Sequence, residues 1–524
     1  MRRPAGVCLV FLALAPAAAA QVVPPPPRLG TISFPTSGSQ AAQAAFIEGV
    51  LYLHSFEYTS AEEAFRRAEQ LDPGFAMAYW GEAMTYTHPV WNEQDASSAR
   101  GALERLGATP AARRARAPTP RERGYLDAVE ALYGDGSKPR RDTLYAQAME
   151  RVVRENPDDH EAKAFYALAL LGLNQGVRDT TTYLRAAAFA DTVFRANPDH
   201  PGGAHYLIHA YDDPLHASRG LEAARAYSRI APDAAHAQHM TTHIFLALGM
   251  WDDVVSQNRI ALGLRQEVPG HYSSWLVYGL IQQGRYGMAQ DLMGILSRNL
   301  GGGGLHAQHD AMVDMRAHFL LQSEDWRSPV FNRRSEHNRM TPAGELADIY
   351  TDGVIAYRRR DQQAIYAAAD EVASLVDALL KGPGAAGPLA LAGRVMARQL
   401  GGMALFLGGD RERAVRAVRE AAALEDAMPM EFGPPLIAEP SHELLGSMLL
   451  EMNPTEAQAE YRRALIAAPG RSRGLMGLIR ASIAAGDKPT AVSALDQLDR
   501  NWRAADPRVR DDLIPLRRLI ARMP

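Results

Sequence analysis

Cysteine is almost absent from this sequence. Of its 524 residues only Cys8 is a cysteine, and it lies close to the N-terminus. The rest of the chain therefore forms no disulfide framework and offers no thiolate for covalent catalysis or metal binding. Long blocks of like charge are missing as well, and the formal net charge is −4. Because a nucleic-acid surface requires a basic patch or stripe, we expect no nucleic-acid partner.

Several short catalytic motifs are missing too. The sequence contains no HExxH metalloprotease helix, no GxxxxGK(S/T) phosphate loop and no GxSxG nucleophile elbow. His442 and Glu443 begin a HExxH-like sequence, but no second histidine follows at the required spacing. The sequence therefore leaves open whether the protein is an enzyme.

The N-terminus has the three-part layout of a secretory signal peptide. Arg2 and Arg3 precede an apolar run over residues 7–15, and three alanines at 18–20 offer a cleavage site before Gln21. The run is shorter than the ~20 residues that a membrane-spanning helix needs. We expect residues 1–20 to be removed and the protein to be exported, either periplasmic or secreted, without a membrane span after cleavage. An uncleaved N-terminal anchor is the alternative.

A proline-rich linker is predicted after the leader. Four consecutive prolines at 24–27 favour a stiff, extended chain, because proline lacks the N–H that a helix or sheet requires. We assign residues 21–38 to this linker and expect folded structure to begin near Ser39.

The remainder of the chain shows a repeated helical pattern. A tetratricopeptide repeat combines small residues where two helices approach, an aromatic residue between them and a proline after the second helix. Residues 42–73 meet this pattern at Gly49, Tyr52, Ala61, Phe65, Ala68 and Pro73. Near the other end the same spacing recurs at Ala457, Tyr461, Ala464 and Pro469. We predict an all-α fold, a right-handed α-solenoid of tetratricopeptide-like hairpins.

Five further stretches strengthen this interpretation. They are AMAYWG at 76–81, AFYALAL at 164–170, HMTTHIF at 239–245, FGPP at 432–435 and PSHELLG at 440–446. With these stretches the sequence resembles a largely uncharacterised family of exported bacterial tetratricopeptide repeat proteins. The resemblance implies the fold and brings no settled reaction with it. A glycine-rich break at 381–384 predicts a soft boundary between a solenoid over 39–380 and C-terminal hairpins over 381–524.

Histidines are concentrated in the middle of the chain. Ten of the sixteen lie between His200 and His309. His205 and His209 form an HxxxH pair on one helix face, and His239 and His243 form a second pair 34 residues later, which is one repeat length. The two pairs therefore take equivalent places in successive hairpins.

This register predicts a metal site. Neighbouring helices pack with axes about 8–10 Å apart, so imidazoles on facing helices can share one ion. We expect the two HxxxH pairs to converge, with His236 or His271 nearby. A nitrogen-rich set of this kind suits copper, zinc or iron. The alternative is that these histidines are hydrogen-bonded structural residues.

The resemblance also implies a concave groove that binds ligands. Its predicted lining residues, beside the histidines above, are Asp212, Asp213, His54, His88 and Trp80. Two functional hypotheses follow. In one, the groove binds a transition metal or a metal-dependent ligand, and the protein is a metalloprotein or a metalloenzyme. In the other, it is a scaffold that captures a peptide, a protein or a small molecule without metal.

Overall fold

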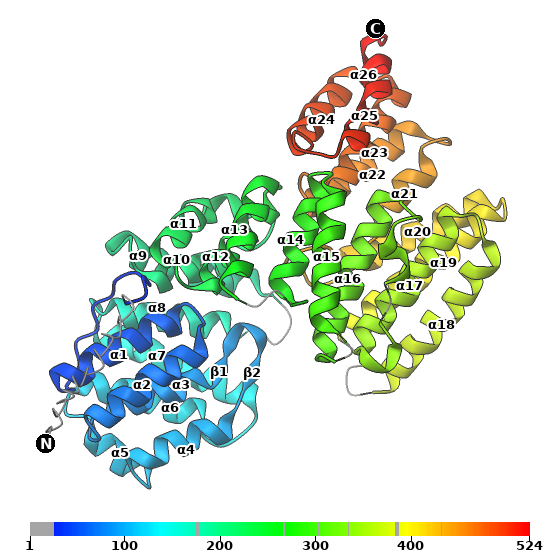
Figure 1. Ribbon diagram of the computed structural model, residues 1–524. Helices are drawn as coiled ribbons and strands as arrows, with labels where there is room; N and C mark the ends of the chain where they lie inside the picture. Colours follow the sequence, from blue (N-terminus) through cyan, green and yellow to red (C-terminus); the bar gives the residue numbers. More distant parts are fainter. Residues whose placement is uncertain are drawn as a thin grey trace, which may run out of the picture.

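A computed structural model describes residues 26–173, 178–265, 268–301, 303–333, 335–382, 387–430 and 432–524. The predicted signal peptide and the start of the predicted linker lie outside these residues. Within them the chain is a succession of helices that curls from one end of the molecule to the other (Figure 1).

The first part of the chain forms helices α1 to α9 and one small antiparallel ribbon, in which Thr87 pairs with Gln94 and His88 with Glu93. The helices are α1 Gln40–His54, α2 Tyr58–Leu71, α3 Ala76–Thr85, α4 Ala96–Leu106, α5 Pro110–Arg116, α6 Pro120–Leu132, α7 Lys138–Glu155, α8 His160–Leu171 and α9 Thr180–Ala196; the ribbon consists of β1 Thr87–His88, η1 Pro89–Trp91 and β2 Glu93–Gln94.

The central part supplies the histidine-rich helices. Its elements are α10 Pro201–Ala210, α11 Ala217–Ile230, α12 Ala235–Ala247, α13 Trp251–Gly263, α14 His271–Gln282, α15 Tyr286–Leu300, α16 His306–Ser323, η2 Pro329–Asn332 and η3 His337–Arg339.

The last part continues the same arrangement. Its helices are α17 Pro342–Arg358, α18 Gln362–Lys381, α19 Pro388–Leu407, α20 Arg411–Asp426, α21 Ser441–Leu449, α22 Pro454–Ala467, α23 Ser472–Ala485, α24 Lys488–Asn501, α25 Pro507–Asp511 and α26 Leu513–Ala521.

The predicted packing pattern is confirmed at both ends of the chain. In the first hairpin the Phe65 ring fills the space over two glycines, and a Cβ atom at Gly49 would lie 2.7 Å from that ring; a Cβ at Gly81 would collide with it as well. In the last hairpins Tyr461 takes the same role, and a Cβ at Gly446 would lie 2.8 Å from its ring. Small residues therefore let the helices approach the central aromatic side chain, as the α-solenoid fold requires.

The buried apolar side chains fall into two clusters, one from Leu29 to Tyr278 and the other from Val255 to Ile520. The two clusters meet at α13 and α14. Helices α18 and α19 pack against each other on either side of the predicted boundary at 381–384. That boundary remains a prediction, and the change of core lies more than a hundred residues before it.

The described end of the predicted linker is attached to the solenoid. Leu29 and Phe34 are buried, and the Phe34 ring packs edge-on to Phe46 at 5.2 Å. Thr31 exchanges backbone and side-chain hydrogen bonds with residues 197 and 199, at the start of α10. The segment 28–38 therefore packs on the helices, and it forms no helix or strand.

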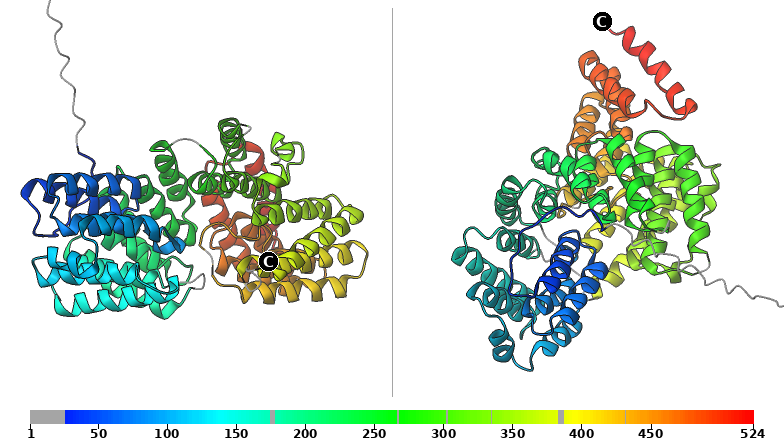
Figure 2. Two further views of the ribbon diagram at one scale, coloured as in Figure 1. Left: turned by 90° about the horizontal axis from the view of Figure 1, so that it is seen from below. Right: turned by 60° about the vertical axis from the view of Figure 1, so that its left-hand side comes forward.

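The C-terminal hairpins fold back onto the middle of the chain, and this closes the concave side. Trp251 Nε1 donates to the carbonyl of Gly470 at 2.9 Å, and Ser472 Oγ donates to the carbonyl of Gln282 at 2.6 Å. In Figure 2 the red and orange helices accordingly lie beside the green ones. Among the described residues, no helix combines the length and apolar character needed to cross a membrane.

Candidate metal centre

Six histidines come together from α10, α12 and α14. These are the first helices of three consecutive hairpins, and we call such helices inner helices. Their ring nitrogens form two groups, and within each group the ligating atoms lie within 4.8 Å of one another. We call them triad A, which is His205, His209 and His236, and triad B, which is His239, His243 and His271. Each triad combines the HxxxH pair of one helix with a single histidine near the start of the next inner helix: α10 with α12, and α12 with α14.

The hydrogen bond of His205 fixes its tautomer in triad A. His205 Nδ1 donates to the backbone carbonyl of His54 at 2.6 Å, so the proton lies on Nδ1 and Nε2 carries a lone pair. The Nε2 atoms of His205, His209 and His236 are all buried, and none has a hydrogen-bond partner among the described residues. Buried polar atoms almost always have partners, so three such nitrogens at one place could accept a metal ion or the O–H of a water molecule.

Apolar side chains surround triad A. The Phe56 ring lies against all three imidazoles, with centroid distances of 4.3 Å to His205, 5.7 Å to His209 and 5.3 Å to His236. Trp91 packs on His236 at 5.7 Å. Burial in these surroundings lowers the pKa of His205 to about 3 and the pKa values of His209 and His236 well below the usual range. The imidazoles are therefore neutral at neutral pH, which is the form that binds metal.

Two hydrogen bonds orient the rings of triad B. His243 Nδ1 donates to Asp212 Oδ2 at 2.5 Å, and His239 Nδ1 donates to Asn258 Oδ1 at 2.7 Å. The Asn258 amide group is itself fixed, because its nitrogen donates to Thr242 Oγ1 and to the carbonyl of Val254. Both imidazoles therefore carry their protons on Nδ1, which leaves lone pairs on Nε2.

These two lone pairs face each other. His243 Nε2 lies 3.1 Å from His239 Nε2, and neither atom holds a proton in the tautomers just described. The contact is repulsive unless a proton or a metal ion lies between the nitrogens. Burial, with His271 nearby, lowers the pKa of His239 well below its usual value, so His239 is the acceptor in this contact and the proton or ion lies on the His243 side or between the two nitrogens. Two imidazoles on one tetrahedral ion, with bonds of about 2.0–2.1 Å, have nitrogens roughly 3.3 Å apart, close to this separation.

His271 completes triad B on its exposed side. Its ring centroid lies 4.4 Å from His239 and 6.0 Å from His243. Trp275, one turn later on α14, packs on His243 at 4.3 Å and on His239 at 4.9 Å. Triad B is thus buried on two sides and open at His271.

The two triads are immediate neighbours. The ring centroids of His209 and His243 are 6.2 Å apart, and those of His236 and His239 are 6.4 Å apart. The structure therefore groups the predicted ligands differently from the expectation that the two HxxxH pairs converge on one ion. A hairpin repeat displaces the second pair along the solenoid, so each pair meets the first-turn histidine of the following inner helix.

A third cluster of the same residue types is fully hydrogen-bonded. Glu161 accepts from His54 Nε2 at 2.8 Å and from His200 Nε2 at 2.9 Å. The remaining nitrogens are also paired: Tyr206 Oη donates to His54 Nδ1, and the N–H of Gly203 donates to His200 Nδ1. Burial alone would raise the pKa of Glu161, but the two histidines outweigh it and lower the pKa to about 2. No lone pair is left for an ion, so we assign a structural role to this cluster.

The structure places the other predicted groove residues as follows. Asp212 is buried and orients His243, whereas Asp213 pairs with Arg178 and His216. His88 lies at the edge of triad A, where its ring stacks on Tyr58 at 4.0 Å.

Two of the predicted groove residues need correction. Trp80 is fully buried between Phe34, Tyr125 and Phe165, so it belongs to the core and is not positioned to contact a ligand. His54 is fully buried as well and contributes to triad A only through its carbonyl oxygen.

Sequence reasoning missed the partners that orient the ligands. Asn258 lies on α13, the outer helix of its hairpin, and the His54 carbonyl that accepts from His205 lies at the end of α1. Neither position carries a local signal. Phe432 begins the FGPP stretch at 432–435, but nothing in the sequence indicated that its ring lies 5.9 Å from the His243 ring.

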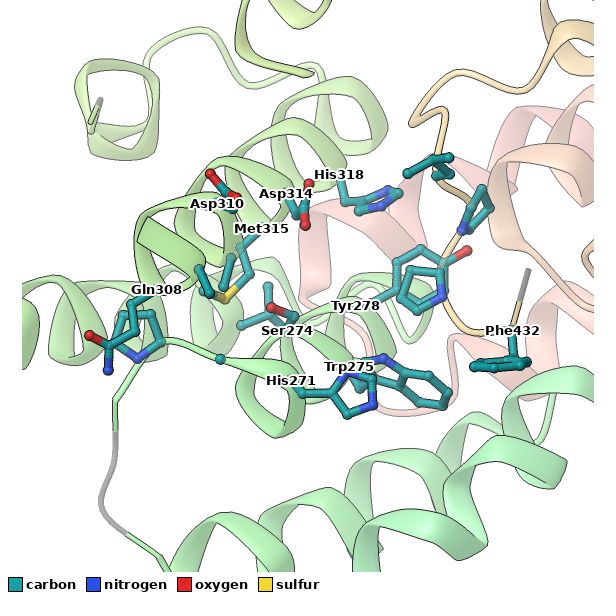
Figure 3. Close-up of a pocket in the computed structure, with 18 residues that line it drawn as sticks. His271, Ser274, Trp275, Tyr278, Gln308, Asp310, Asp314, Met315, His318 and Phe432 are labelled. Atoms are coloured by element: carbon teal, nitrogen blue, oxygen red, sulfur yellow. The ribbon is translucent and has the colours of Figure 1, made fainter. Parts of the chain in front are cut away.

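Two pockets adjoin triad B. One, of about 420 Å³, lies between α14 and α16 and is bordered by Phe432 (Figure 3). The other, of about 450 Å³, lies between Asp212, Trp251 and α22. Both are lined by the segment 432–436, which separates them.

No protein-family model matches the sequence, and no curated protein matches it either. Among solved structures, the chain is similar to the human IFIT1 dimer with m7Gppp-AAAA, at 14% identity over 90% of this chain and 92% of that chain, with a TM-score of 0.36. It is also similar to the APC/C hetero-tetramer Cut9–Hcn1, at 10% identity over 92% of this chain and 76% of that chain, with a TM-score of 0.33. Likenesses this low say nothing about what this chain binds.

Proposed function

We propose that this solenoid carries a pair of transition-metal ions, one held by His205, His209 and His236 and the other by His239, His243 and His271. The observation that carries the proposal is the set of lone pairs: three buried, unpartnered Nε2 atoms in triad A and two facing Nε2 atoms in triad B. A three-histidine set that leaves one coordination position open is typical of ions that do chemistry, whereas structural ions have closed shells.

The donor set favours copper among the predicted metals. Imidazole nitrogen suits copper, zinc and iron, and copper binds such ligands most tightly of the divalent ions. Imidazole nitrogens are neutral ligands. Among the described residues Asp212 reaches His243 Nδ1 rather than an open lone pair, and Glu57 reaches only the backbone N–H of His236. Two zinc ions would add four positive charges to these surroundings, but two Cu(I) ions would add only two. Burial of uncompensated charge is costly, so the smaller charge is favoured.

The chain's own residues then have distinct tasks. The carbonyl of His54, the amide of Asn258 and the carboxylate of Asp212 each hold an Nδ1 proton, so that the opposite nitrogen points to the ion. Phe56 and Trp275 exclude water from the imidazole faces. A pair of bound copper ions would supply electron transfer and oxygen chemistry, and His271 marks the side from which a small molecule reaches them.

Elemental analysis tests this proposal directly. The full chain, prepared without a histidine tag and supplied with copper, zinc or ferrous iron in separate preparations, is expected to retain about two equivalents of metal after desalting, with copper retained best. A His209→Ala/His243→Ala double variant, which lacks one ligand from each triad, serves as the comparison and is expected to retain almost none. Retention of less than a tenth of an equivalent by the parent protein with all three metals would refute the proposal.

A metal-free binding scaffold is the second candidate, and the pocket of about 450 Å³ favours it. This pocket is lined by exposed or half-exposed apolar side chains, among them Leu215, Met430 and Ile466. Such a surface suits an apolar peptide segment, as expected of helical repeat proteins. It predicts no stoichiometric metal, so the same elemental analysis separates the two candidates.

A further inference from the structure

The pocket of about 420 Å³ shares a wall with triad B. It opens between α14 and α16, and His271 and Trp275 of α14 form one side of it. His271 belongs to triad B, and Trp275 packs on the other two histidines of that triad. Any molecule that fills this pocket therefore contacts the one open edge of the candidate metal centre.

The opposite side of the pocket is acidic. Asp310 and Asp314 project from α16, across the pocket from His271 and Trp275, as Figure 3 shows. No lysine or arginine is among the described lining residues. The pocket is therefore polarised, with carboxylates on one side and the His271 imidazole on the other.

Only one of the two carboxylates is free to receive a ligand. Asp310 accepts hydrogen bonds from the backbone N–H and the hydroxyl of Thr341, at 3.0 and 2.6 Å. Asp314 is exposed to the pocket, and among the described residues no hydrogen bond or ion pair engages its carboxylate. Protein surrounds Asp314 on its other sides, and this desolvation, together with Asp310, raises its pKa to about 7. A cation beside Asp314 would offset that cost.

The space between the two ends is lined by aromatic faces. Trp275 and Tyr278 lie on α14, and Phe432 lines the pocket beside them. His318 adds a polar atom at the back wall: its side chain is 6% exposed, and its Nδ1 has no hydrogen-bond partner among the described residues. Pockets of roughly 300–1,000 Å³ with apolar walls and a few polar groups are the usual shape of small-molecule sites.

We propose that this pocket binds a small arylalkylamine, with its ammonium group at Asp314 and its aromatic ring between Trp275 and Phe432. The far edge of the ring then points towards His271. The orientation towards an ion rests on the proposed metal centre, whereas the binding itself rests only on the pocket. Charge complementarity selects the cation, and the aromatic walls select the ring.

Calorimetric titration with three probes of one ring system tests the binding. The probes are tryptamine, which is cationic, indole-3-acetamide, which is neutral, and indole-3-acetate, which is anionic. The full chain is titrated as purified and after removal of metal by a chelator, with circular dichroism as a check on folding. We expect tryptamine to bind at least tenfold more tightly than the amide and the acetate to bind most weakly, in both preparations.

Two variants locate the cation. Asp314→Asn is expected to weaken tryptamine binding about tenfold and to leave the amide unchanged. Asp377→Asn removes the same charge from an exposed position on α18, outside the pocket, and is expected to change nothing. Equal binding of the three probes, no binding of any, or an Asp314→Asn variant with unaltered tryptamine affinity would each overturn the proposal.

The orientation has its own readout. In protein loaded with Cu(II), the oxidised form of the proposed copper centre, tryptamine at saturation is expected to change the electron paramagnetic resonance spectrum, and this change is expected to disappear in the Asp314→Asn variant at the same concentration. Tight binding without a spectral change would refute the orientation towards triad B. Failure of the protein to take up any metal would refute the metal centre instead, and it would leave the result from the chelated preparation standing.

Discussion

The cluster around Glu161 and the two triads are both built from buried histidines, but they differ in how many ring nitrogens have a hydrogen-bond partner. At Glu161 two histidines meet one carboxylate, and each of their four ring nitrogens has a partner. In the triads each defined Nδ1 is held by a carbonyl, amide or carboxylate oxygen. The Nε2 atoms of triad A have no partner among the described residues, and those of His239 and His243 face each other. All three clusters satisfy a distance criterion for metal binding. What separates them is whether any lone pair remains unused.

Removing one histidine ligand is expected to change the metal content more than any other substitution. His209→Ala should remove about one equivalent of metal by disabling triad A, and His243→Ala should remove the other by disabling triad B, because loss of one ligand in three takes away most of a site's affinity. His200→Gln, which keeps an N–H donor near Glu161, should retain both ions. Elemental analysis of the three variants measures this.

The opposite pattern would erase the distinction between the clusters. If His200→Gln lost an ion, or if both alanine variants kept two, the unpartnered nitrogens would not mark the sites. Loss of both ions from either alanine variant would instead mean that the triads bind metal only as a pair, which their centroid distances of 6.2 and 6.4 Å permit.

A smaller effect is expected from the oxygen atoms that hold the ligand protons. Asp212→Asn should weaken the triad B ion 10- to 100-fold, the usual consequence of removing a carboxylate behind a ligating histidine, and should leave triad A unchanged. Asp213→Asn is the matched control, because Asp213 is adjacent in sequence but pairs with Arg178 and His216. Competition with a chromogenic chelator measures both affinities. Equal weakening by the two variants would show that charge alone, and not the bond to His243, supports the site.

The fold was readable from the sequence because its signals are local. Gly49 and Phe65 act within one hairpin, and the 34-residue offset between the HxxxH pairs follows from one repeat length, so both could be recognised without a structure. All six proposed ligands were among the predicted residues for the same reason. The division into two triads depends on how far each helix is rotated and displaced relative to the next, which no spacing encodes.

The residues that orient the ligands could not be found in this way. Asn258 reaches His239 from an outer helix, and the His54 carbonyl reaches His205 across 151 residues of sequence. For Trp80 the prediction was wrong in the opposite direction. Its place on the first helix of a hairpin predicted a groove residue, but its side chain fills the core between Phe34 and Phe165. Contacts across repeats decide these roles.

The smallest expected effect is a pH dependence confined to the Glu161 cluster. The pKa of this carboxyl group is about 2 in the folded protein against an ordinary value of 4.5, because the interactions with His54 and His200 outweigh burial. A depressed folded pKa means that the unfolded chain binds the proton more readily, so the stabilisation is fully present above about pH 4.5 and is lost as the pH falls towards 2. The difference in unfolding free energy between the parent protein and Glu161→Gln should therefore shrink by up to about 1.4 kcal/mol per pH unit in that window. Urea unfolding midpoints at pH 5, 4 and 3, recorded with a chelator so that metal loss does not contribute, measure it. A difference that stayed constant with pH would show that Glu161 is not held ionised by the two histidines, and the contrast between a saturated cluster and two open triads would then lose its electrostatic basis.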